Sequence, residues 1–413
     1  MNTKKVELLA PAGDLEKLKI AVLYGADAVY IGGEAYGLRA KAKNFSIETM
    51  KEGIDFAHAK GVKVYVTANI YAHNADFEGM ADYFRDIEKI GADALIISDP
   101  GVFSLAREVV PNMEIHISTQ ANNTNWHSAN FWHGLGAKRV VVARELSLGE
   151  IGEIRKNIPE DMDIEAFVHG AMCISYSGRC LLSNYLSGRD ANKGACAHPC
   201  RWKYRLVEET RPGEYMPIEE NERGTYIYNS KDLCMIDHIP ELIDAGIYSF
   251  KIEGRMKTPF YVGNVIKAYR EAIDDYISDP ELYESKKAYY INEVSKASHR
   301  DFTTAFYFGK PDGNQQVYTN NTYIRDYDFV GMVMENSDKD GFAAVMQRNK
   351  FSKGETVEIM PQKGRDWNMN VGIILNEDGE EIESAPHPQQ IVRLKFPKPV
   401  LKYDLIIKEV KTV

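Results

Sequence analysis

Short apolar runs alternate with amphipathic stretches over the first 255 residues of this 413-residue chain. The runs are rich in valine and isoleucine and almost continuously apolar, which is typical of strands buried on both faces of a parallel sheet. The pattern predicts eight such strands, at residues 6–10, 27–33, 62–68, 92–98, 114–118, 138–143, 163–169 and 247–254. The segments between them have apolar residues at helical spacing and end at glycines such as Gly25 and Gly61, as helices commonly do.

Eight strands with helices between them predict an α/β fold, an irregular eight-stranded (β/α) barrel of the TIM type. An open doubly wound sheet is the alternative, and the absence of a GxGxxG motif after a strand disfavours it. The barrel is irregular because a long insertion separates the seventh strand, which ends at 169, from the eighth, which begins at 247. Active sites of such barrels lie at the carboxyl ends of the strands, so an insertion at that end predicts a functional segment.

The pattern changes after the eighth strand. Residues 256–300 have helical spacing, and from 330 onward short alternating strands are separated by turns such as KDG and EDG, which is typical of a small β domain. We therefore predict a TIM-like catalytic domain over 1–300 with a cysteine-rich insertion at 170–230, a connector over 301–329, and a small all-β barrel over 330–413.

Composition and charge narrow the class of protein. The content of 44% apolar and 27% charged residues is that of a globular chain. A net charge of −10 excludes a uniformly basic surface that coats nucleic acid, but it allows a local basic groove. No window approaches the length of about eighteen apolar residues that a membrane span needs, and the N-terminus lacks a signal-peptide pattern. We therefore expect a cytoplasmic protein without a membrane partner.

Four of the five cysteines lie close together in the insertion, with the spacing Cys173-x6-Cys180-x15-Cys196-x3-Cys200. Thiolates select zinc, copper(I) or iron–sulfur clusters. Structural zinc sites usually have Cys-x2-Cys pairs, whereas wider spacing suits a cluster whose ligands lie further apart. We predict that these four residues bind a 4Fe-4S cluster, with ordinary buried thiols as the alternative. Cys234 is predicted at a helix start, where it packs in the core or replaces one of the four ligands.

The residues around these cysteines resemble a known family. The run Glu165-x-Phe167-x2-Gly170-Ala171-Met172-Cys173-x4-Gly178-x-Cys180-x-Leu182-Ser183 is similar throughout to the signature of peptidase family U-32, the collagenase-like peptidases. The segments ELLAPAGDLEKLKIAVLYGADAVYIGG, HISTQANNTN, NSKDL and SFKIEGRMKTPFYV also look like that family, in the same order. The resemblance covers most of the chain, including its β-rich C-terminal part.

The family name implies proteolysis. This chain, however, has neither an HExxH nor a GxSxG motif, and cysteines that bind a cluster cannot also be free nucleophiles. Other members of the family are similar to iron–sulfur proteins that hydroxylate aromatic rings without oxygen, on ubiquinone precursors, on a ribosomal RNA cytidine or on the wobble uridine of tRNA. The segment RDANKGACAHPCRW looks most like the tRNA branch, which makes 5-hydroxyuridine and uses prephenate.

The resemblance therefore implies a tRNA uridine 5-hydroxylase with a 4Fe-4S cluster, with prephenate as co-substrate and tRNA as partner. The alternatives are a U-32 peptidase, a related hydroxylase that acts on rRNA or on a quinone precursor, and a non-catalytic subunit that carries a cluster.

Further candidate residues follow from the barrel, which brings the strand ends to one rim. Arginine forks suit the carboxylates of a small dicarboxylate such as prephenate. The predicted substrate-binding residues are Arg39, Arg144, Arg255, Gln120, Asn122 and Lys251. Each arginine has a structural ion pair as its alternative. Glu165 and His169 alternate along one strand, which predicts that both face the same side and serve as catalytic residues. Their alternatives are a buried hydrogen-bond partner and a core histidine.

Alanine substitutions test the predicted ligand set. We expect Cys173→Ala, Cys180→Ala, Cys196→Ala and Cys200→Ala each to abolish the visible absorbance of the anaerobically purified protein, because each removes one thiolate from the cluster. Cys234→Ala is the control and should keep the absorbance. A bleached Cys234→Ala protein beside a brown Cys200→Ala protein would mean that the fourth ligand is misassigned.

Overall fold

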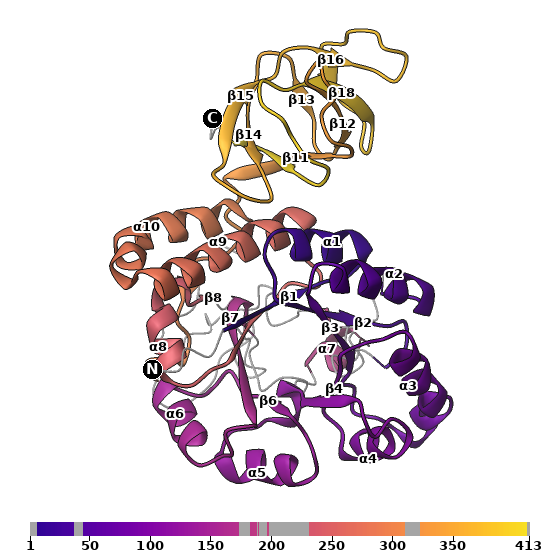
Figure 1. Ribbon diagram of the computed structural model, residues 1–413, viewed down its shortest axis with the longest axis vertical. Helices are drawn as coiled ribbons and strands as arrows, with labels where there is room; N and C mark the ends of the chain where they lie inside the picture. Colours follow the sequence, from indigo (N-terminus) through magenta and orange to yellow (C-terminus); the bar gives the residue numbers. More distant parts are fainter. Residues whose placement is uncertain are drawn as a thin grey trace, which may run out of the picture.

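The chain folds into a closed parallel barrel followed by an antiparallel β domain, as seen in a computed structural model (Figure 1). The structure describes residues 6–36, 44–172, 182–187, 189, 196–197, 231–309 and 323–410. Both parts of the predicted fold class are confirmed. None of the helices within these ranges is long and apolar enough to cross a membrane.

The strands of the barrel follow one another around the ring in chain order. They are β1 (Glu7–Pro11), β2 (Ala28–Gly32), β3 (Lys63–Ala68), β4 (Ala94–Ile97), β5 (Glu114–Ile117), β6 (Arg139–Val141), β7 (Asp163–Ala171) and β9 (Ser249–Ile252). Each strand pairs in parallel with the next, and β9 pairs with both β7 and β1, which closes the ring. The eight predicted strands are therefore confirmed, and the open doubly wound sheet is excluded.

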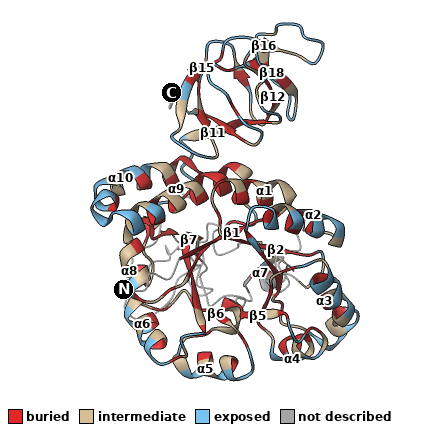
Figure 2. Cartoon of the chain, viewed as in Figure 1, coloured by how far each residue is buried: buried red, intermediate tan, exposed pale blue. Residues whose placement is uncertain are grey.

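Helices surround the ring, and their red, buried residues lie mostly on the side that faces the strands or a neighbouring helix (Figure 2). They are α1 (Leu15–Leu23), α2 (Ile47–His58), α3 (Met80–Lys89), α4 (Pro100–Val109), α5 (Trp126–Gly134), α6 (Leu148–Lys156), α8 (Ile239–Asp244), α9 (Pro259–Ser278) and α10 (Pro280–Lys296). Helix α7 (Leu182–Ser187) lies in the insertion, and short 3-10 helices span η1 (Asn74–Phe77), η2 (Thr119–Ala121) and η4 (Ile236–His238).

The sequence Gly-Ala-Asp occurs before two strands and makes the same backbone turn and hydrogen bond at both. Gly25 and Gly91 have φ values of 112° and 91°, a conformation that glycine adopts without steric cost after a helix. The aspartate two residues later then accepts a hydrogen bond from the start of the preceding strand. Asp27 accepts from the N–H of Leu8 at 3.0 Å, and Asp93 accepts from the N–H of Val64 at 2.7 Å. The motif thus ends a helix and also fixes the alignment of neighbouring strands.

Strand β7 continues beyond the barrel and pairs antiparallel with β8 (Asp232–Cys234), which also pairs with β10 (Phe302–Thr303). The prediction of a helix start at Cys234 is therefore wrong, because the extension of β7 provides a pairing edge that a local sequence window cannot reveal. In this ladder Ala171 lies opposite Asp232. The segment between these two residues therefore leaves and rejoins the barrel at one point, beside the carboxyl end of β7.

The C-terminal domain is a curved antiparallel sheet that forms a half-barrel. Its strands are β11 (Tyr327–Val333), β12 (Phe342–Gln347), β13 (Phe351–Ser352), β14 (Thr356–Met360), β15 (Trp367–Asn370), β16 (Ile374–Leu375), β17 (Ser384–Ala385), β18 (Ile391–Lys395) and β19 (Leu405–Glu409). The main sheet has the order β15-β14-β19-β11-β12-β18-β16, and β13 pairs with β17. Buried and half-buried residues alternate along β12, as in a strand with one face in a core.

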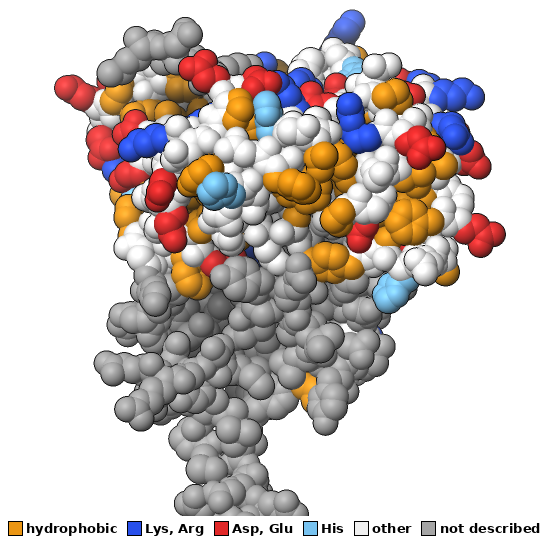
Figure 3. Space-filling model, turned by 90° about the horizontal axis from the view of Figure 1, so that it is seen from below, with side chains coloured by type: hydrophobic (Ala, Val, Ile, Leu, Met, Phe, Trp, Pro, Cys, Tyr) orange, Lys and Arg blue, Asp and Glu red, His pale blue; other side chains and the backbone are white. Residues whose placement is uncertain are grey.

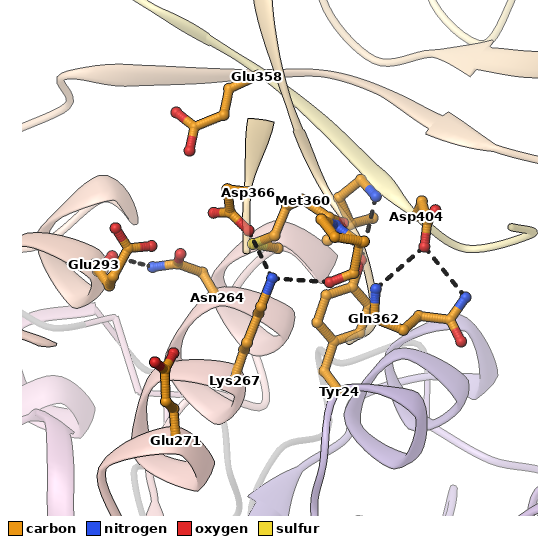
Figure 4. A network of polar contacts seen from close by, with 12 residues as sticks. Tyr24, Asn264, Lys267, Glu271, Glu293, Glu358, Met360, Gln362, Asp366 and Asp404 are labelled. Carbon is orange, nitrogen blue, oxygen red and sulfur yellow. Dashed lines mark hydrogen bonds and ion pairs between the residues drawn. The ribbon is translucent and has the colours of Figure 1, made fainter. Parts of the chain in front are cut away.

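The two domains share part of one core (Figure 4). Met360 and Leu405 of the β domain belong to the apolar cluster of the barrel. Between them, the buried hydroxyl of Tyr24, directly after α1, donates to the Met360 carbonyl at 2.8 Å and accepts from the Leu405 N–H at 3.2 Å. Lys267 on α9 forms an ion pair with Asp366 at 2.6 Å. The β domain is therefore joined to α1 and α9 by apolar packing and by directional contacts.

Removal of one hydroxyl tests this interface. Tyr24→Phe keeps the ring but leaves the buried Met360 carbonyl and Leu405 N–H without this partner, so we expect the free energy of unfolding to fall by about 1–3 kcal/mol. Urea denaturation measures the change. Tyr276→Phe is the control, because Tyr276 is a half-buried tyrosine on α9 that packs edge-on against Tyr283. Equal effects of both substitutions would argue against the interface contact.

Candidate functional site

The carboxyl ends of the parallel strands form one rim of the barrel, and polar side chains gather there. Asn69 follows β3, Ser118 and Gln120 follow β5, Arg144 follows β6, and Arg255 follows β9. This is the end at which barrels of this type carry their active sites. The insertion is rooted at the same end through β7 and β8. We take this rim, which we call the mouth, as the candidate site.

Arg255 is buried in the mouth, with 4% of its surface exposed. Its guanidinium donates to Thr67 Oγ1 at 3.2 Å and to Asn44 Oδ1 at 3.3 Å. A side chain at Gly32 would displace it, because a Cβ there would lie 2.0 Å from Arg255 Nη2. The absence of a side chain at Gly32 therefore makes room for the Arg255 guanidinium at the end of β2.

Arg144 is half-buried after β6, which β7 separates from β9 in the ring. Its Nη1 donates to the carbonyl of Ala171 at 2.9 Å, and its guanidinium lies 5.1 Å from the centre of the Phe167 ring. It therefore lies beside the root of the insertion. Arg39, the third predicted arginine, lies outside the described residues.

Gln120 and Asn122 lie at the end of β5, in and just after η2. The Gln120 N–H donates to Ser118 Oγ at 3.3 Å, and its carbonyl accepts from the hydroxyl of Tyr71. Asn122 has a φ of 54°, a left-handed conformation that asparagine tolerates better than most residues. The structure thus places both predicted residues at the mouth.

Below the mouth, the inside of the barrel is filled by an ionic network of four buried residues, Glu7, Arg139, Glu165 and Lys251. Arg139 Nη1 lies 2.6 Å from Glu7 Oε1 and 3.1 Å from Glu165 Oε2. Lys251 Nζ lies 2.6 Å from the other oxygen of Glu165. The two cations and two carboxylates balance, which is the condition for keeping charges away from water.

This network sets the protonation of its members. Burial alone would raise the pKa of Glu165, but Lys251 and Arg139 lower it to about 2. Burial and the charge of Arg139 lower the pKa of the neighbouring His116. Glu165 is therefore ionised at neutral pH, with both oxygens engaged. This geometry favours the structural alternative for Glu165, and the catalytic role of Glu165 and the binding role of Lys251 stay predictions.

His169 does not share the surroundings of Glu165. A bulge between Phe167 and His169 breaks the alternation of β7 relative to β9, so the prediction that both residues face the same side is wrong. The His169 ring instead packs among aromatic rings, at 5.5 Å from Tyr269 and 5.7 Å from Phe302. Burial and the charge of Lys257 lower its pKa to about 3. The ring is therefore neutral and surrounded like a core histidine, and its catalytic role stays a prediction.

The cysteines can be placed only in part. Cys173, Cys180 and Cys200 lie outside the described residues, whereas Cys196 is half-buried. Its carbonyl accepts from Arg189 at 3.3 Å. Within the ranges that the structure describes, no group of three or more His, Cys, Asp or Glu could hold a metal ion. Four thiolates nevertheless have the donor chemistry that iron–sulfur clusters require.

Cys234 is unlike these residues because it is built into the core. It lies on β8 opposite His169, and burial raises its pKa to about 12. This pKa describes the thiol without a bound metal, and a metal that coordinates a thiol deprotonates it. The packing role and the ligand role of Cys234 therefore both stay predictions.

Glu7 and Arg139 were not predicted as site residues, although the sequence around each of them indicated a buried charge. Each is a charged residue inside a short apolar run, VELLA and KRVVVA. Charged residues are rarely buried without a partner, so two opposite charges in separate predicted strands indicated a pair inside the ring.

Comparisons with known proteins cover both domains. The family described as "Peptidase family U32" matches residues 13–317, and the "Peptidase family U32 C-terminal domain" matches residues 325–406. The "tRNA hydroxylation protein P1" of Bacillus subtilis (strain 168) is 44% identical over 406 residues, which cover 98% of this chain and 95% of that protein.

Two proteins of Escherichia coli (strain K12) are also similar. The "tRNA hydroxylation protein P" is 39% identical over 445 residues, with 98% of this chain and 97% of that protein covered. The "23S rRNA 5-hydroxycytidine C2501 synthase" is 36% identical over 311 residues, with 74% of this chain and 46% of that protein covered.

Loss of one charge tests the network. Glu165→Gln leaves Arg139 and Lys251 with an excess of buried positive charge, so we expect the free energy of unfolding at pH 7 to fall by about 3 kcal/mol or more. A protein that also carries Lys251→Met should recover part of this loss, because both members of the pair are then neutral. No recovery in the double variant would contradict the pairing.

The pH dependence has a definite sign. The pKa of Glu165 falls from an ordinary 4.5 to about 2 in the folded protein. Its contribution to stability is therefore complete above pH 4.5 and is lost as the pH falls toward 2. Between pH 4.5 and 3 the stability of the original protein should fall more steeply than that of Glu165→Gln, as measured by urea denaturation. Parallel curves would show that Glu165 is not held ionised.

Proposed function

This chain belongs to peptidase family U32, and on that premise we propose that it is an RNA hydroxylase that acts on tRNA. The observation that carries the proposal is the similarity to a tRNA hydroxylation protein at 44% identity over 98% of the chain. That similarity extends over the barrel and the β domain together. The similarity to an rRNA 5-hydroxycytidine synthase covers 74% of the chain and supports the same class of reaction, hydroxylation of a pyrimidine in RNA.

More specifically, we propose that the product is 5-hydroxyuridine at the wobble position of tRNA. Hydroxylation replaces a ring hydrogen by a hydroxyl group, which is a two-electron oxidation and needs an oxygen donor that is reduced by the same two electrons. We propose prephenate as that donor and a 4Fe-4S cluster held by Cys173, Cys180, Cys196 and Cys200 as the cofactor. When bound, such a cluster supplies electron-transfer and Lewis-acid chemistry.

The mouth offers this chain's own residues for binding and orientation. Arg255 and Arg144 lie in it, and guanidinium groups bind carboxylates in a bidentate manner. We propose that they bind the two carboxylates of prephenate. Because the Glu7 and Glu165 carboxylates below are already paired with Arg139 and Lys251, the acids of the barrel do not oppose that binding.

A tRNA is much larger than the mouth, so a second surface is needed. Over the described residues of the face around α5, acidic and basic side chains are interspersed among apolar ones (Figure 3). Phe131 and Leu135 are among the exposed apolar residues of this region. Without a gathering of lysine and arginine in its described part, this face is a poor candidate for contacts with phosphates. We therefore propose that tRNA binds over the mouth and the β domain.

Arginine substitutions test the role of the mouth. We expect Arg144→Ala and Arg255→Ala each to weaken prephenate binding by about 2 kcal/mol or more, because each removes one charge-assisted contact. The affinity for tRNA should change far less. Calorimetry with prephenate and filter binding with tRNA provide the two measurements.

Arg107→Ala is the control for these variants, because Arg107 lies near the end of α4 and bonds the Pro111 carbonyl. An equal loss of both ligands in the mouth variants would indicate a collapsed fold, and unchanged prephenate binding would remove these arginines from the site.

The activity itself is tested by mass spectrometry of tRNA nucleosides from a strain that lacks the gene. 5-Hydroxyuridine should be absent and should return when the full chain is supplied. The same purified protein, incubated with collagen, should release no peptides. Release of peptides together with unchanged nucleosides would favour a peptidase instead.

A further inference from the structure

A cluster of neutral polar side chains lies at the mouth, across the ends of three neighbouring strands. It consists of Asn69 after β3, Ser98 after β4, and Ser118 and Gln120 after β5; we call it the amide cluster. Asn69 Nδ2 donates to Ser118 Oγ at 3.2 Å, and the Gln120 N–H donates to the same oxygen at 3.3 Å. Ser118 is thus the centre that holds both amide residues.

The backbone of the amide cluster is fixed from outside. Ser98 Oγ donates to the carbonyl of Asn69 at 2.9 Å, and the hydroxyl of Tyr71 donates to the carbonyl of Gln120. The Asn69 side chain is therefore held through its Nδ2, and the Gln120 backbone through its N–H and its carbonyl. Such anchoring keeps the binding residues in place before the ligand arrives.

Two side-chain oxygen atoms of the amide cluster do not take part in its hydrogen bonds. Asn69 Oδ1 and Gln120 Oε1 are both buried and have no hydrogen-bond partner. A buried acceptor without a donor costs about 1–3 kcal/mol. Groups of this kind are retained where a ligand supplies the missing donor. The amide cluster is therefore suited to a ligand that carries two hydrogen-bond donors.

We propose that the amide cluster recognises the target uridine by its two hydrogen-bond donors. This inference rests on the proposed function. A uridine within an RNA chain has one donor on its ring, N3–H, and one on its ribose, the 2′-hydroxyl. Asn69 Oδ1 and Gln120 Oε1 accept one donor each. RNA-binding proteins commonly read unpaired bases through these groups.

The chemistry of the cluster excludes the acidic co-substrate as its ligand. Two carbonyl oxygens repel a carboxylate, whereas the cationic Arg255 attracts one. Arg255 donates to Thr67 on β3, two residues before Asn69, which follows the end of that strand. The anion and the nucleotide would therefore lie next to each other at the mouth, as a reaction between them requires.

The test compares RNA stem-loops that carry uridine, 3-methyluridine or 2′-deoxyuridine at the target position. With the full-length protein, each change removes one donor and should lower kcat/KM at least tenfold. In Asn69→Ala and Gln120→Ala, the uridine stem-loop should itself react at least tenfold more slowly, and each variant should lose discrimination against one of the two modified RNAs. Asn130→Ala is the matched control, because this asparagine lies on α5 and bonds the Asn157 carbonyl; it should behave like the original protein.

Discrimination is a ratio between two RNAs measured on one protein sample, so a partly unfolded variant does not change it. If both amide variants still discriminate against 3-methyluridine and 2′-deoxyuridine as strongly as the original protein, the inference is wrong and the proposed function stands. A raised KM for prephenate with unchanged discrimination would also overturn it. If the original protein hydroxylates none of the RNAs, the proposed function fails and the inference fails with it.

Discussion

Closure of the barrel through β9 is the constraint on which the rest of the structure depends. Because β9 pairs with both β1 and β7, no barrel strand keeps a free edge, and every inward side chain must find its partner inside the ring. Glu7 and Arg139 lie 132 residues apart in the sequence, and Glu165 and Lys251 lie 86 apart. These residues meet because the ring closes, and their pairing in turn fills the ring without leaving a buried charge uncompensated.

The closed ring also separates two kinds of electrostatic environment along its axis. The lower layer holds charges that neutralise one another within hydrogen-bond distance. The upper layer holds arginines and amides whose contacts include neutral oxygens, such as those of Thr67, Ser118 and Ala171. A ligand at the mouth therefore meets guanidinium groups on one part of the rim and neutral acceptors near the amides. This division suits a site that must hold an anion beside an uncharged ring.

Much of this architecture could be predicted from the sequence because its causes are local. The eight strands are short and largely apolar, most of them with valine or isoleucine, and glycines such as Gly25 mark the helix ends. What could not be predicted depends on contacts that are distant in the chain. Cys234 lies on a strand because β7 extends beyond the barrel to pair with it, and His169 leaves the alternation because of a bulge relative to β9. At the mouth, the sequence placed Arg144, Arg255 and Gln120 correctly at strand ends, but no periodicity could reveal that Ser118 joins Asn69 to Gln120.

The pairing of Ala171 with Asp232 has a consequence for how this family can diversify. Since the two ends of the insertion are held together by a ladder that belongs to the barrel, the number of residues between them can change without a shift in the register of any barrel strand. Doubling such a segment adds only about 0.6 kcal/mol of closure entropy. The length of this segment can therefore vary among related chains while the barrel scaffold stays the same.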